Sequence, residues 1–95
     1  MGAREEAIKR LERTSEGKEA MADCIRFLDG IEAADPAAVD TLGIAIRRNL
    51  SPAAAAALLD ALKAYRRELD RKRQWAANLM DSLAQIFDVK NPEID

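Results

Sequence analysis

The sequence predicts an all-helical protein: an antiparallel hairpin of two long helices with a short bridging helix, two such hairpins pairing into a four-helix-bundle dimer. Charged residues are 34% of the 95 positions, while glycine and proline together fill only seven, a composition typical of long amphipathic helices. Two proline-containing helix starts lie mid-chain, and apolar residues recur at heptad spacing on either side of them. The length fits one domain, residues 1–95.

The first long helix is expected over about 3–34. Thr14, Ser15 and Gly17 interrupt its centre and can divide it into two helices. Because glycine inside a helix costs only about 1 kcal/mol, and the heptad phase is the same on both sides, we favour one helix with a kink allowed. The two core positions contain apolar residues on both sides of the interruption, Ala7, Leu11, Met21, Ile25 and Leu28, together with the polar residues Arg4, Thr14, Lys18 and Glu32.

The bridging helix is expected over about 36–48. Asp35 is placed to cap its first turn, and Pro36 fits the first helical position, where no backbone N–H is needed. Its apolar face consists of Val39, Leu42 and Ile46. The segment therefore predicts a short amphipathic helix between the two long ones.

The second long helix is expected over about 52–88. Ser51 and Pro52 repeat the cap and first-position pair, and no proline or glycine follows until Pro92. Such a helix would be roughly 55 Å long at ~1.5 Å per residue. Nine of its ten core positions are apolar or aromatic, with Lys72 the exception. A flexible tail is expected over 90–95.

The short connection between the long helices predicts that they run antiparallel. The register that best matches large and small side chains places Ala7 beside Leu79 and Leu28 beside Leu58. The same register brings opposite charges together at two places: Glu12 with Arg73, and Glu19 with Arg66.

In this register the end of the second long helix extends past the start of the first. An uncovered apolar stripe usually marks an interface, so we predict a homodimer. The candidate dimer-interface residues are Leu79, Leu83, Ile86 and Phe87.

The residues needed for catalysis are scarce, and we predict that the chain is not an enzyme. It has no histidine, the usual acid-base group and commonest metal ligand. Its single cysteine, Cys24, lies among apolar residues, where a packed side chain is the favoured interpretation. The four glycines are isolated and form no phosphate-binding loop. No catalytic residue, cofactor or metal is expected.

The location predicted for the chain is the cytoplasm. Its first ten residues lack the apolar core of a signal peptide, and no apolar run approaches the roughly 18 residues of a membrane span. One cysteine allows no internal disulfide, which fits a reducing compartment. No membrane association is expected.

A basic strip, residues 63–73, contains six basic and two acidic residues, a net charge of +4. Binding to phosphates is possible in principle, but the whole chain has a net charge of -2 and a pI near 5.2. The predicted register also directs Arg66 and Arg73 toward carboxylates. The candidate residues for binding a partner are therefore Lys63, Arg67 and Arg71, together with Trp75 at the margin of the hairpin.

These observations favour a non-catalytic protein–protein interaction module: an adaptor, an assembly chaperone or an inhibitor of a larger protein machine, such as those of phages. One alternative is a nucleic-acid-binding helical dimer that uses the basic strip from Lys63 to Arg73. The other is a purely structural assembly subunit.

Overall fold

The computed structural model describes residues 2–89, and this part of the chain is all-helical, as predicted. The expected tail, 90–95, lies outside the described residues. The elements are α1 (Ala3–Glu12), α2 (Ser15–Glu32), α3 (Pro36–Asn49), α4 (Pro52–Leu62), a 3-10 turn η1 (Lys63–Tyr65), α5 (Arg66–Lys72) and α6 (Gln74–Ile86).

Side-chain caps fix three of the helix starts. Asp35 accepts a hydrogen bond from the Ala38 backbone N–H at 3.2 Å, and Ser51 accepts one from Ala54 at 3.2 Å. Both helices carry proline in the first turn, so the predicted starts at Pro36 and Pro52 are confirmed. The third cap is Thr14, whose Oγ1 accepts from the Gly17 N–H at 3.0 Å.

The single helix expected over 3–34 is wrong, because the chain breaks between Glu12 and Ser15. Thr14 has extended dihedral angles and caps a new helix, α2. Gly17 lies so close to the backbone of Leu11 that an added Cβ would overlap the Leu11 carbonyl. Glycine therefore permits the close approach on which the turn depends, and α1 packs against α2 and α4.

The single helix expected over 52–88 is also wrong. The chain tightens into η1 after Leu62, and it leaves helical geometry at Arg73, whose φ is -139° and ψ is 54°. Helix α6 then folds back against α5 and α3. A straight helix would have carried Met80 away from these neighbours, whereas the fold-back buries its side chain completely.

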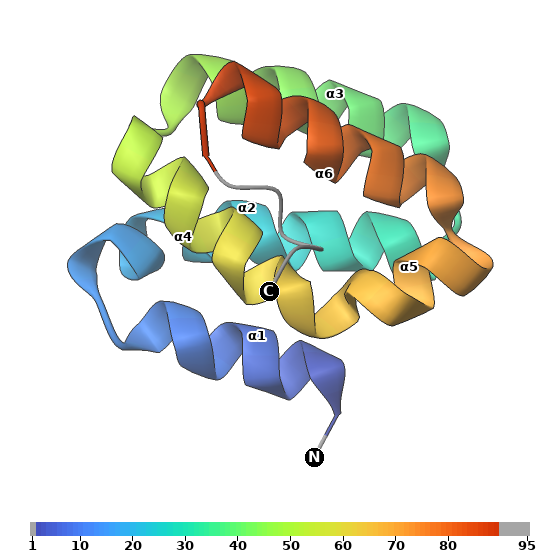
Figure 1. Cartoon of the computed structure of the whole chain (residues 1–95), viewed down its shortest axis with the longest axis horizontal. Helices are drawn as coiled ribbons and strands as arrows, with labels where there is room; N and C mark the ends of the chain where they lie inside the picture. The colour runs from blue at the N-terminus through green and yellow to red at the C-terminus, as the bar shows by residue number, and fades with distance from the viewer. Residues whose placement is uncertain (1, 90–95) are drawn as a thin grey trace.

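The helices form a compact bundle, not a two-helix hairpin. Helices α3 and α6 lie side by side along one edge, α1 lies along the opposite edge, and α2 and α4 lie between them (Figure 1). The Cα atoms extend over 30 × 30 × 24 Å. Packing of α2 against α4 agrees with the predicted pairing, but α1 contacts α4 and η1 in place of the segment that became α6.

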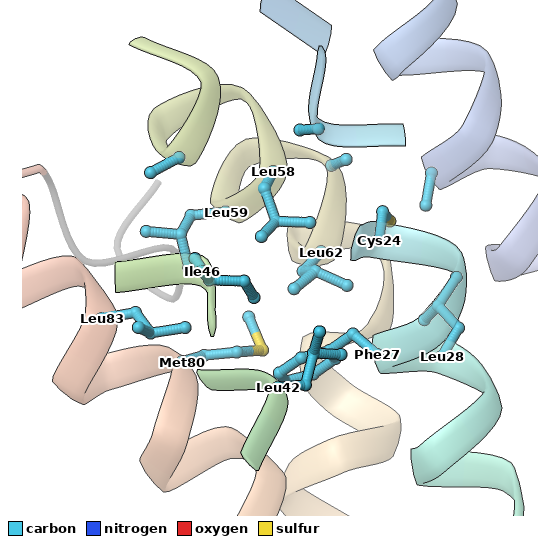
Figure 2. Close-up of a cluster of buried hydrophobic side chains, with 14 of the residues drawn as sticks. Cys24, Phe27, Leu28, Leu42, Ile46, Leu58, Leu59, Leu62, Met80 and Leu83 are labelled. Atoms are coloured by element: carbon cyan, nitrogen blue, oxygen red, sulfur yellow. The ribbon is translucent and has the colours of Figure 1, made fainter. Parts of the chain in front are cut away.

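All six α-helices of the described chain contribute to the core, and four of them meet at its centre. Phe27 of α2 is fully buried, as are Leu58 and Leu62 of α4. Figure 2 shows Met80 of α6 reaching toward Ile46 of α3 at the centre of this cluster. Burying a side chain of this size contributes about 1.5–3 kcal/mol, so the meeting of helices here stabilises the bundle.

The turn between α1 and α2 predicts an unusual response to a Gly17→Ala substitution. In an uninterrupted helix alanine would stabilise by about 1 kcal/mol. Because the new Cβ would overlap the Leu11 carbonyl, we expect Gly17→Ala to lower the free energy of unfolding by about 1–3 kcal/mol, measured by urea denaturation.

Gly2→Ala is the matched control, since a Cβ at Gly2 meets no atom within 4 Å. A stabilised Gly17→Ala protein would contradict the break between α1 and α2.

Candidate functional site

Two large apolar side chains stand out on the surface of the described residues: Ile44, 51% exposed, and Ile86, 49% exposed. Ile44 belongs to α3 and Ile86 to the end of α6, and these helices lie side by side (Figure 1). Together with Arg47 and Arg48 they line one open hollow of about 460 Å³. We call this hollow the α3–α6 groove.

Among the described residues, no carboxylate forms an ion pair with the two arginines of the groove. Both lie in the last turn of α3, where a cation interacts favourably with the helix dipole. Within residues 2–89, neither Arg47 nor Arg48 forms an ion pair or a side-chain hydrogen bond. Arg4 differs, since it binds Asp29 at 2.8 Å and Glu32 at 3.0 Å. Within the described part of the chain, the guanidinium groups of the groove thus have no competing carboxylate.

The predicted partner-binding residues are only partly outward. Arg67 and Arg71 are exposed on α5 and have no ion pair among the described residues. Lys63 is 24% exposed and forms an ion pair with Asp60 at 3.7 Å. Trp75 is half-buried and packs against the core. The basic strip is therefore smaller than its sequence indicates.

Most of the predicted dimer-interface residues pack inside a single chain instead of lying on its surface. Leu83 is 1% exposed and belongs to the core, so its assignment to the surface is wrong. Leu79 is half-buried over Gly43, where an added Cβ would stand 3.1 Å from Leu79 Cδ1. Phe87 is half-buried against the core, which leaves Ile86 as the open member of the set. The reason is the fold-back of α6 onto α3, which covers the stripe that a straight helix would expose.

Both predicted ion pairs between the long helices are wrong. Glu19 accepts a hydrogen bond from the Ser51 hydroxyl at 2.7 Å, and Arg73 Nε donates to the Ile31 carbonyl at 3.3 Å. The helices that were to bring these charges together are interrupted at Thr14 and at Arg73.

Arg66, whose predicted partner was Glu19, binds Asp81 of α6 at 2.6 Å and Asp70 of its own helix at 3.1 Å. Only 8% of Arg66 is exposed. The hydrogen bonds to Asp81, followed by those to Asp70, hold the pKa of Arg66 above its ordinary value against the opposing effect of burial. These contacts lock α5 to α6 in the described structure.

A second hollow, of about 300 Å³, lies between the end of α2 and α5 and is lined by Tyr65 and several charged residues. Its charges are already paired: Lys72 lies 3.4 Å from Glu68, and Glu32 is bound by Arg4. Arg73 donates to the Ile31 carbonyl. This hollow therefore offers a ligand fewer unsatisfied groups than the α3–α6 groove does.

The described residues also show what Cys24 can do. It is fully buried between α2 and its neighbours (Figure 2). Burial raises the pKa of the thiol to about 12, so the nucleophilic thiolate is scarce near neutral pH. Across residues 2–89 no three metal-binding side chains gather into a group, and none of the helices is long and apolar enough to cross a membrane.

Comparison with models of known families, with curated proteins and with solved structures finds no match to this chain. We therefore infer its function from its own residues.

Sequence reasoning missed Ile44, Arg47 and Arg48. The signal was present: on a helix whose buried face contains Leu42 and Ile46, Ile44 points away from that face, and two arginines follow one turn later. The sequence did single out Ile86, but as part of a dimer interface and not of the α3–α6 groove. What the sequence could not reveal is that α6 would bring Ile86 beside Ile44.

The Arg66 contacts predict that Asp81→Ala destabilises the protein more than Glu68→Ala does. Asp81→Ala removes the shortest ion pair of the nearly buried Arg66, and we expect the free energy of unfolding to fall by about 2–3 kcal/mol. Glu68→Ala removes an exposed pair with Lys72 and should cost less than about 0.5 kcal/mol. Equal losses in urea denaturation would contradict the role given to Asp81.

Proposed function

We propose that this chain is a non-catalytic protein-interaction module of the cytoplasm that holds part of another protein in the α3–α6 groove. The observation that carries the proposal is the meeting of Ile44 and Ile86, the exposed large apolar residues of the described chain, with two arginines that form no ion pair within residues 2–89. Exposed apolar surface is unfavourable in water, and arginine is enriched at protein interfaces. Adaptors, assembly chaperones and inhibitors of larger machines all act through such contacts.

The chemistry of the rest of the chain supports a binding role over catalysis. The sequence has no histidine, and the one thiol is held protonated inside the core. A nucleic-acid role has weaker support, because Arg66 is buried with Asp70 and Asp81, and Lys72 lies beside Glu68. Within the basic strip of residues 63–73, the outward arginines Arg67 and Arg71 supply few phosphate contacts.

A second copy of the chain is the competing occupant of the groove. Ile86, from the predicted dimer face, supports this alternative because its side chain is half exposed. The apolar area that the pair of isoleucines offers is small for a stable dimer, which usually buries about 800 Å² per partner. Sedimentation equilibrium distinguishes the two: the proposal expects the mass of one chain at micromolar concentration, and a dimer that Ile86→Asp dissociates would assign the groove to self-association.

The proposed function predicts a partner whose capture depends on the groove. The tagged chain, expressed in the cell that encodes it, should recover a protein that the Ile44→Asp/Ile86→Asp variant loses, as measured by quantitative mass spectrometry of cross-linked material. Aspartate at these positions opposes burial of the apolar surface at an interface.

Ala22→Asp/Ala53→Asp is the matched control, since both alanines are exposed and lie outside the groove. The control should retain the partner. If the wild-type chain and both variants recover the same proteins, the groove is not the binding surface.

A further inference from the structure

Among the described residues, the charge that lines the α3–α6 groove is of one sign. Ile44, Ile86, Arg47 and Arg48 supply the lining, and none of them is acidic. The chain as a whole has a net charge of -2, so this positive lining differs from the average of the surface. A partner that brings carboxylates to this place would gain attraction at a distance and hydrogen bonds on contact.

The arginines are placed to flank an apolar contact. Arg47 and Arg48 follow Ile44 by three and four residues, so both lie one helical turn beyond it on α3. Ile86 faces the same hollow from α6. A side chain that enters the groove thus meets two isoleucines, and a carboxylate close to it in sequence meets a guanidinium. Arginine binds carboxylates through two parallel hydrogen bonds, which fixes orientation as well as charge.

The shape of the site selects the class of partner. The lining borders an open hollow of about 460 Å³, which has room for a side chain. Binding flat on a membrane requires a continuous apolar helix face, and two isoleucines do not supply one. Isoleucine also offers no hydrogen bond to the edges of nucleic-acid bases.

We infer that the α3–α6 groove binds an acidic linear segment of another protein, in which a large apolar residue is flanked by carboxylates. This inference rests on the proposed function and names the partner's chemistry. The apolar residue packs between Ile44 and Ile86, while the carboxylates bind Arg47 and Arg48.

A library of random peptides displayed on phage tests this inference without knowledge of the natural partner. Selection on the wild-type chain should enrich peptides that combine aspartate or glutamate with leucine, isoleucine, phenylalanine or tryptophan. The enriched peptides should bind the Arg47→Glu/Arg48→Glu variant at least about tenfold more weakly in fluorescence anisotropy, because each lost hydrogen bond between charged groups is worth about a factor of ten.

Arg13→Glu/Lys18→Glu is the matched control: it makes the same change of charge on exposed residues near the turn between α1 and α2, outside the groove. The enriched peptides should bind this variant with an affinity close to that of the wild type. Equal weakening in both variants would show that net charge, and not the groove, attracts the peptides, and would overturn the inference. Circular dichroism melting verifies that both variants remain folded.

Three further outcomes would also overturn it: enriched peptides without acidic residues, no enrichment over the Arg47→Glu/Arg48→Glu variant, or groove-dependent binding to phosphatidylserine vesicles in place of peptides.

The cellular partner separates this inference from the proposed function. A partner that Ile44→Asp/Ile86→Asp loses but Arg47→Glu/Arg48→Glu retains would leave the proposed function intact and exclude the acidic segment.

Discussion

The ion pairs of Arg66 determine where the last helix lies. Its guanidinium, almost completely buried, binds Asp70 on its own helix and Asp81 on α6. A buried guanidinium requires such partners, because an unpaired charge in the interior is very costly. The contact between α5 and α6 can form only if the chain turns sharply between them, which it does at Arg73. The turn has no glycine or proline to mark it, so tertiary contacts, more than local preference, account for the break.

The candidate binding surface depends on the same fold-back. Because α6 returns along α3, Met80 and Leu83 enter the core while Ile86, one turn beyond Leu83, remains at the surface beside Ile44. The groove is thus made by two helices that are distant in sequence, α3 and α6. Its two arginines lie in the last turn of α3, where they are exposed. The stability of the core and the exposure of the groove follow from one arrangement of α6.

The sequence predicted the helical class and the starts of two helices, because the caps of Asp35 and Ser51 are local interactions. It misled on helix length. The heptad pattern fits a two-helix seam, yet Phe27, Leu59 and Met80 lie off that seam and are buried. Apolar residues on more than one side of a helix require additional neighbours, which a hairpin does not supply. These off-seam apolar residues are visible in the sequence. The sequence does not show which helices would cover them, because that depends on long-range packing.

The most direct test of the fold-back is a nuclear Overhauser measurement on the Leu79 methyl groups. In the structure Leu79 covers Gly43, so its methyl protons should give strong cross-peaks to the Gly43 Hα protons. A hairpin of two long helices would instead place Leu79 beside Ala7. Cross-peaks to Gly43 are the predicted result, and cross-peaks from Leu79 to the Ala7 methyl, with none to Gly43, would contradict both the fold and the groove that depends on it.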